Sequence, residues 1–163
     1  MHSSANNIHF RISGLPSQPF QHLFALSENE LAALGVTREF SDDSAPGYPC
    51  RVSLAHAAPG EELLLLSWQH QDVNSPYRAA GPIFVRKLAG DVFDKINVVP
   101  EPVRVRLLSV RAYDARGMIV EADVVEGNEI EVLIARFFAR SDVEYLHIHY
   151  ARRGCYAARV ERA

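Results

Sequence analysis

Apolar residues recur along the chain with two periods, one typical of helices and one typical of strands. The clearest helix is predicted over residues 129–140, where apolar side chains spaced three and four apart share one face: Ile130, Leu133, Ile134, Phe137 and Phe138. Asn128 is placed to cap this helix. A shorter helix is predicted to begin after Ser27, which has the spacing of a capping box with Glu30, and to end at Gly35, because glycine readily adopts the positive φ of a helix stop.

Alternating or continuously apolar segments predict short strands over much of the remaining chain. They cover residues 8–12, 50–54, 61–68, 83–86, 103–113, 118–125, 143–150 and 155–161. Four consecutive leucines at 63–66 predict a central strand with both faces covered. Residues 42–49 and 69–82 lack a period and are predicted as loops, and Gly117 predicts a hairpin turn. These elements predict an α+β fold in a single domain of residues 1–163, with a mostly antiparallel or mixed β-sheet and two or three helices.

Composition and charge narrow the class of partners. Hydrophobic residues make up 48% of the 163 residues, and 17 basic residues against 20 acidic ones give a net charge of −3. Such a chain can bury a core, but it lacks the positive field that would favour nucleic acid or an anionic membrane as partner. The N-terminal residues do not resemble a secretory signal, and apolar runs such as 63–66 are too short to span a bilayer. We therefore expect a cytoplasmic protein in which Cys50 and Cys155 are thiols.

Several segments together resemble a bacterial protein family. They are residues 10–16 (FRISGLP), 46–54 (PGYPCRVSL), 75–78 (SPYR), 81–86 (GPIFVR) and 147–160 (HIHYARRGCYAARV). The family is called domain of unknown function 1203, and the resemblance extends over about residues 8–162. It implies a compact bacterial domain and implies no activity, cofactor or partner. The positions that the family shares correspond in this chain to Cys50, Arg51, Arg78, Arg86, His149, Cys155 and Arg159.

Two histidines near the C-terminus define a candidate metal site. His147 and His149 lie two residues apart in a predicted strand, so their side chains share one face and their backbones are about 6.7 Å apart. Two imidazoles so placed can bind zinc or iron, although the same pattern also describes histidines on a polar sheet face. Cys155 joins them if it pairs with Ala151 across the hairpin, but it lies on the opposite face if it pairs with Tyr150. The sequence leaves both registers open.

Cys50 is a candidate nucleophile, because Arg51 follows it and a cationic neighbour activates a thiol. Catalysis would also need a histidine within hydrogen-bond reach, for which His149 and His70 are candidates. The alternative is a buried, unreactive cysteine at the start of a strand. A zinc site that combines both cysteines with the two C-terminal histidines would lack the closely spaced cysteine pair of structural zinc sites.

Arginines indicate a third kind of site. Guanidinium groups that converge on a cleft bind carboxylate or phosphate, whereas isolated ones form ordinary ion pairs with nearby aspartates. The leading hypothesis is a small anionic ligand held in a pocket of cysteine, arginine and histidine side chains, with Cys50 and His149 as candidates for thiol-assisted catalysis. The candidate ligand-binding residues are Arg51, Arg78, Arg86, Cys155 and Arg159. A metal-binding protein and a non-catalytic interaction domain are the alternatives, and the sequence contains no phosphate-binding loop, nucleophile elbow or dinucleotide motif.

Overall fold

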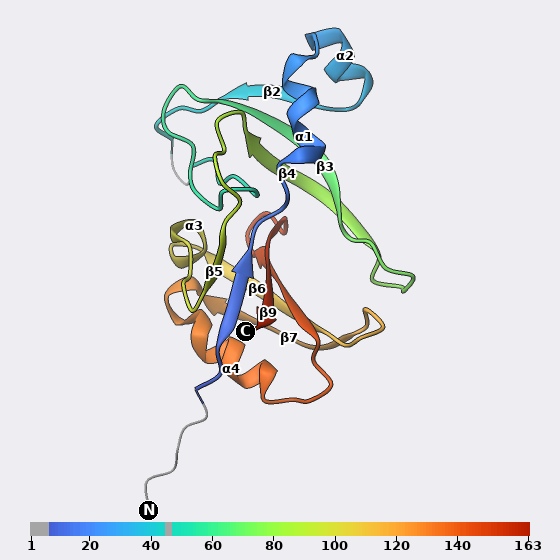
Figure 1. The fold of residues 1–163 in the computed structure, drawn as a ribbon, viewed down its shortest axis with the longest axis vertical. Coiled ribbons are helices and arrows are strands. Elements are labelled where there is room, and N and C mark those ends of the chain that lie inside the picture. The colour runs from blue at the N-terminus through green and yellow to red at the C-terminus, as the bar shows by residue number, and fades with distance from the viewer. Residues whose placement is uncertain (1–6, 45–46) are drawn as a thin grey trace, which may run out of the picture.

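Two antiparallel β-sheets organise the chain, as a computed structural model that describes residues 7–44 and 47–163 shows (Figure 1). The larger sheet has the spatial order β5 (Asp94–Ile96), β1 (Phe10–Ser13), β9 (Tyr156–Arg162), β8 (Tyr145–Tyr150), β6 (Leu107–Tyr113) and β7 (Ile119–Glu126). The smaller sheet has the order β2 (Thr37–Phe40), β3 (Glu62–Gln71) and β4 (Ala79–Arg86). The predicted α+β class is confirmed, and β3 is the central strand that its leucines predicted.

The helices are short and lie outside the sheets. They are α1 (Gln18–Gln21), η1 (His22–Ala25), α2 (Glu28–Ala33), α3 (Glu101–Arg104), η2 (Gly127–Glu129) and α4 (Ile130–Phe138). None of the helices in the described residues is long and apolar enough to cross a membrane. The α2 capping box is confirmed, because Ser27 Oγ accepts from the Glu30 amide at 3.2 Å and Glu30 Oε2 accepts from the Ser27 amide at 2.9 Å.

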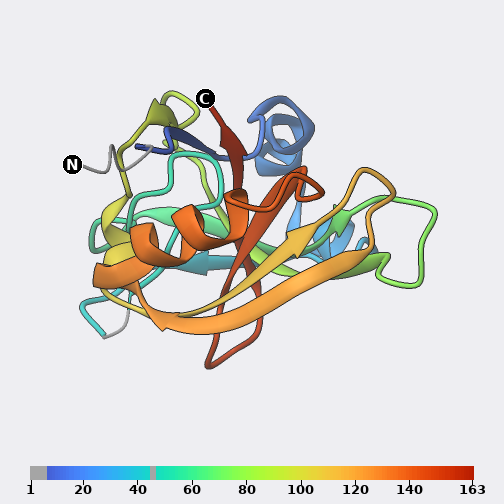
Figure 2. The same cartoon turned by 90° about the horizontal axis from the view of Figure 1, so that it is seen from below.

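Helix α4 covers one face of the larger sheet (Figure 2). All five apolar residues of its predicted face are buried, and they share a core with Leu108, Ile148 and Val160 from the strands. The predicted cap at Asn128 is wrong, because the chain first forms η2 and the helix then begins after Glu129 without a side-chain cap. Burial of the apolar side chains therefore stabilises this helix more than capping at its N-terminus does.

The predicted loop over residues 69–82 is half wrong. β3 continues to Gln71 and β4 begins at Ala79, so strands of a hairpin replace both ends of the loop and only 72–78 remains as its connection (Figure 1). The strands pair there across a bulge, and the buried Gln71 side chain donates to the Tyr145 hydroxyl of the other sheet at 2.9 Å. Contacts with a distant sheet therefore order a segment whose own sequence has no strand period.

The predicted strand over residues 50–54 is also wrong. Cys50 forms only an isolated bridge with Phe84, and the next three residues turn. The Cys50 amide donates to the Ala55 carbonyl at 2.9 Å, and Leu54 has a φ of +50°, so the chain reverses instead of extending. Of the predicted loop over 42–49, positions 45 and 46 lie outside the described residues. The strand predicted from 103 begins only at Leu107, after the short helix α3.

The C-terminal hairpin combines the two registers that the sequence left open. Next to the turn, the Tyr150 amide donates to the Cys155 carbonyl at 2.9 Å, and His149 lies opposite Tyr156. A β-bulge then shifts the pairing by one residue, so that His147 lies opposite Arg159. Since residues directly opposite each other point to the same face, Cys155 is on the face of Tyr150, whereas Arg159 is on the face of the histidines.

Candidate functional site

An arginine-lined cavity of about 360 Å³ lies where residues of both sheets meet. This volume is within the range of pockets that hold small molecules. Four lining residues are arginines, namely Arg51, Arg106, Arg152 and Arg153. Glu126 is the one acidic residue among the described residues that line it. The remaining wall is mostly apolar and is formed by Gly47, Pro49, Phe84, Val105, Leu107, Tyr150 and Cys155.

Arg51 is the most deeply buried charge of this cavity, with only 2% of its surface exposed. The turn that replaces the predicted strand directs its side chain inward. There Nε donates to the Tyr156 carbonyl at 2.6 Å, Nη1 donates to the Pro49 carbonyl, and Nη2 donates to Cys155 Sγ at 3.0 Å. No carboxylate forms an ion pair with Arg51 within the described residues. A buried guanidinium without a counter-charge is costly, so this position favours an anion.

A second guanidinium, that of Arg106, shares the Tyr150 ring with Arg51. The two guanidinium carbons lie 5.0 Å and 4.9 Å from the ring centre, respectively. Burial is the main cause that lowers the pKa of Arg106, and Arg51 lowers it as well. The nearby Tyr150 and Cys155 raise this pKa. Nη1 of Arg106 lies 2.8 Å from His56 Nε2, and burial, followed by this guanidinium, lowers the pKa of His56. The neutral imidazole therefore accepts from Arg106, whose Nη1 also donates to the Pro102 carbonyl at 2.9 Å.

The turn between β8 and β9 supplies the rest of the positive charge. Arg152 and Arg153 are exposed there, and Gly154 has the positive φ of 78° that such a tight turn needs. Cys155 follows the turn, is half-buried and lines the cavity beside Arg51. The site thus has a buried inner arginine, an apolar wall and an exposed arginine pair.

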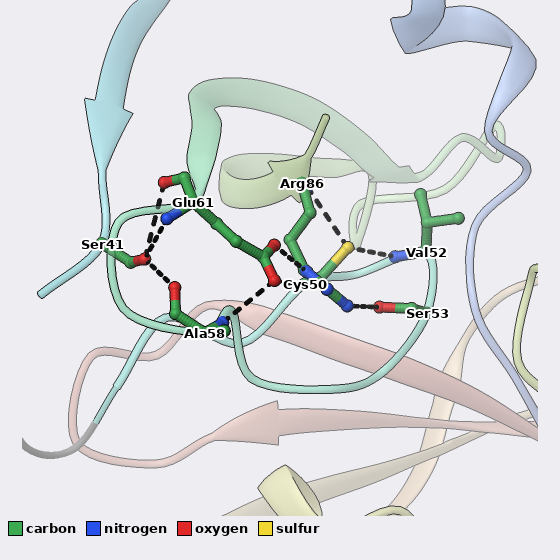
Figure 3. Close-up of polar contacts among 7 residues, drawn as sticks. All are labelled: Ser41, Cys50, Val52, Ser53, Ala58, Glu61 and Arg86. Atoms are coloured by element: carbon green, nitrogen blue, oxygen red, sulfur yellow. Dashed lines mark hydrogen bonds and ion pairs between the residues drawn. The ribbon is translucent and has the colours of Figure 1, made fainter. Parts of the chain in front are cut away.

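Cys50 does not line this cavity. It is fully buried, and its Sγ accepts from the backbone amides of Val52 and Arg86, each at 3.4 Å (Figure 3). Neither predicted histidine partner is bonded to it, because His149 bonds to other groups and the ring nitrogens of His70 have no hydrogen-bond partner. Among the two readings of Cys50, its surroundings favour the buried, unreactive thiol.

Arg86 and Glu61 form an ion pair instead of a ligand site (Figure 3). Arg86 donates to Glu61 through Nε at 2.5 Å and through Nη2 at 2.7 Å, and its Nη1 donates to Ser53 at 3.3 Å. The hydrogen bond from Arg86 is the main cause that lowers the pKa of Glu61. Both side chains are about 15% exposed, so this bidentate pair holds two loops together.

Arg78 and Arg159 also lie away from the cavity lining. Arg78 is exposed in the β3–β4 loop and pairs with Asp72 at 3.2 Å. Arg159 lies 4.0 Å from the Tyr145 ring centre and donates to Glu161 at 2.9 Å. Of the predicted site residues, only Arg51 and Cys155 are among the described residues that line this cavity. Sequence reasoning missed Arg106, Tyr150, Arg152 and Arg153; the Arg152–Arg153 pair, separated from Cys155 by Gly154 alone, was the one signal that pointed to the cavity.

The predicted histidines lie between the two sheets, where His70 of β3 joins them. The ring centres of His70 and His149 are 5.0 Å apart, and those of His147 and His149 are 6.4 Å apart. Burial is the main cause that lowers the pKa of His147 to about 2 and that of His149 to about 4. Nδ1 of His147 and both ring nitrogens of His70 have no hydrogen-bond partner. The cluster is thus a neutral, buried packing layer.

This geometry gives the metal hypothesis little support. Nδ1 of His149 lies 2.9 Å from the Gly154 carbonyl and Nε2 lies 3.3 Å from Nη1 of Arg111, so both of its ring nitrogens already have partners. Across residues 7–44 and 47–163, no group of three or more His, Cys, Asp or Glu side chains is arranged to hold a metal ion. A nearby guanidinium also disfavours a second cation. Zinc or iron binding at His147 and His149 stays a prediction.

The fold and the cavity together define an α+β protein with two antiparallel sheets and an arginine-lined pocket that both sheets border. The family model described as "Protein of unknown function (DUF1203)" matches residues 47–162, and the chain belongs to this family. The matched region contains all the described residues that line the cavity. Searches of curated proteins and of solved structures found no match.

Proposed function

We propose that this protein binds a small organic anion with an apolar body in the arginine-lined cavity. The observation that carries the proposal is Arg51, a buried guanidinium at the cavity wall for which the described residues provide no carboxylate. An anionic ligand would supply the missing counter-charge. Arg106 lines the same cavity and contacts the same Tyr150 ring, so it would add a second positive charge to the anion site.

The chemistry of the walls defines the ligand further. A carboxylate or phosphate would accept hydrogen bonds from the guanidinium groups at the inner end of the cavity. The apolar body would contact Phe84, Val105 and Leu107, which have no polar side-chain atoms to satisfy. Arg152 and Arg153, which are exposed, would attract the anion from solvent and contribute less to its affinity.

A matched series of probes tests the proposal: octanoate, octan-1-ol and octylamine share one apolar chain and differ in charge. Binding to the folded state raises the unfolding temperature, so a thermal shift ranks the three probes. We expect octanoate to raise the unfolding temperature most and octylamine least. Equal shifts for octanoate and octan-1-ol would contradict the proposal, since only the anion can use the arginines.

Variants locate the effect within the molecule. Replacing both Arg152 and Arg153 by alanine should weaken octanoate binding about fivefold, because exposed charges each contribute up to about 1 kcal/mol. The matched control replaces Arg116 and Arg136 by alanine, which also removes two exposed positive charges but touches no part of the cavity. Equal losses in the two double variants would mean that net charge, and not the cavity, governs binding. If the cavity variants lose stability but octanoate binding does not change, the result would favour the alternative that this protein is a non-catalytic interaction domain.

A further inference from the structure

We propose that Cys155 is a covalent modification site, at which the cavity directs small carboxylate-bearing disulfides to thiol–disulfide exchange. This inference rests on the proposed anion site and adds a reaction to it. It starts from the position of Cys155 in the wall of the same cavity, half-buried and therefore open to a ligand that enters.

The contact between Arg51 and Cys155 gives the sulfur its chemistry. Nη2 of Arg51 donates to Sγ at 3.0 Å, so a cationic hydrogen-bond donor lies directly against the sulfur in the cavity wall. The thiolate is the species that attacks a disulfide. Arg51 is buried, donates to two backbone carbonyls and has no carboxylate partner among the described residues, so no negatively charged side chain there offsets its attraction for an arriving anion.

Selection by charge follows from the surroundings of the sulfur. An anionic disulfide that approaches Cys155 passes Arg152 and Arg153 and reaches a wall that also contains Arg106. The same positive charges repel a cationic disulfide. Fields of this kind change local concentrations, and hence reaction rates, by tenfold or more.

The other described cysteine does not compete for the reagent. Cys50 is fully buried, and its sulfur already accepts from two backbone amides. It does not line the cavity, so the structure offers no neighbouring thiol there to convert the adduct of Cys155 into an internal disulfide. A mixed disulfide formed at Cys155 therefore persists until an external thiol removes it.

The exchange step balances without a further oxidant. The Cys155 thiolate attacks one sulfur of the small disulfide, a new S–S bond forms, and the original S–S bond breaks. The half of the small disulfide that is not attached to Cys155 leaves as a thiolate and takes a proton from solvent. Cys155 is oxidised to a mixed disulfide, the departing sulfur is reduced, and the arginines stabilise the negative charge of the leaving group.

Three disulfides of different charge test this inference: 3,3′-dithiodipropionate, bis(2-hydroxyethyl) disulfide and cystamine. Intact-protein mass spectrometry follows each adduct, and N-acetylcysteine amide serves as the model thiol that corrects for the intrinsic reactivity of each reagent. At Cys155 we expect the rate ratio of the anionic to the neutral reagent to exceed that of the model thiol by about tenfold. The cationic reagent should be the slowest. A ratio equal to that of the model thiol would overturn the inference.

Variants assign the reaction to the site. Cys155→Ser should form no adduct, whereas Cys50→Ser should react like the parent protein. The double alanine variant of Arg152 and Arg153 should lose most of the preference for the anion, and the control double variant of Arg116 and Arg136 should keep it. Modification at Cys50 in the folded protein, mapped by peptide analysis, would contradict the assignment.

The same samples separate this inference from the anion site on which it rests. Octanoate binding is measured on the parent protein by thermal shift, and octanoate should slow the modification of Cys155 because both occupy one cavity. If octanoate binds but the disulfides show no charge preference, the thiol chemistry fails and the anion site stands. If octanoate neither binds nor protects, both proposals fail.

Discussion

Acidification should destabilise this protein through its buried histidines. His147 and His149 lie between the sheets, where Arg111 and Arg159 add positive charge and His70 supplies a third imidazole. Burial lowers the pKa of His147 to about 2 and that of His149 to about 4, both below the unfolded value of 6.5. Below pH 6.5 the unfolded chain therefore binds protons at these two histidines that the folded chain does not bind. The stability that depends on these two histidines being neutral is fully present above pH 6.5 and is lost as the pH falls from 6.5 toward 4 and below.

The size of the effect follows from the two pKa values. Each proton that only the unfolded state binds costs about 1.4 kcal/mol of stability per pH unit. At pH 4.5, two units below the unfolded pKa, His147 costs about 2.7 kcal/mol and both histidines together cost about 5 kcal/mol. Because domains are stable by only about 5–15 kcal/mol, this loss is large enough to bring the protein close to unfolding.

Urea unfolding at pH 7.5 and pH 4.5, followed by the fluorescence of Trp68, measures this loss. His147→Phe keeps a ring among Tyr113, Tyr145 and Tyr156 but cannot be protonated. We expect this variant to lose about 2.7 kcal/mol less than the parent on acidification, whatever its stability at pH 7.5. His22→Phe, at an exposed histidine, is the matched control and should lose as much as the parent. If His147→Phe and the parent respond equally to pH, His147 is protonated in the folded protein and the reasoning is wrong.

Two further predictions concern the loops that position Arg51. Glu61→Gln leaves the guanidinium of Arg86 largely buried without a carboxylate, so the free energy of unfolding in urea should fall by about 2–4 kcal/mol; a change below about 0.5 kcal/mol would contradict the structural role of this pair. Gly14→Ala would place a Cβ atom 2.1 Å from the Val52 carbonyl oxygen, within the turn that directs Arg51 inward. We expect this variant to lose several kcal/mol of stability and to bind octanoate more weakly, whereas unchanged unfolding and binding would show that the turn tolerates displacement.

Local signals in the sequence predicted the parts of the fold that depend on neighbours along the chain. The α4 stripe and the Ser27–Glu30 capping box are patterns within one helix, and both are confirmed. The central strand β3 was predicted from its leucines, but its extension to Gln71 depends on Tyr145 of the other sheet. The turn after Cys50 depends likewise on backbone bonds to Ala55 and Phe84, which a short apolar segment does not encode.

The site was predicted less well, because its residues come from distant segments. Arg51 contacts Tyr156 and Cys155, which are more than 100 residues away along the chain. Whether Arg159 shares a face with the histidines depends on a single β-bulge, and no residue pattern in the hairpin revealed it. Arg106 has no special sequence context, and only the fold brings it beside Tyr150. Of the arginines predicted as ligand-binding, only Arg51 is among the described residues that line the cavity, because the turn after Cys50 directs its side chain inward.

The most direct test of the anion site is a calorimetric titration of octanoate into the parent protein and into Arg106→Gln. Arg106→Gln keeps a hydrogen-bonding side chain but removes one of the two guanidinium groups beside Tyr150. We predict one site per chain in the parent and an affinity lower by about tenfold to a hundredfold in the variant, as the loss of a charge-assisted hydrogen bond implies. Equal affinities, or no saturable binding to the parent, would contradict the account.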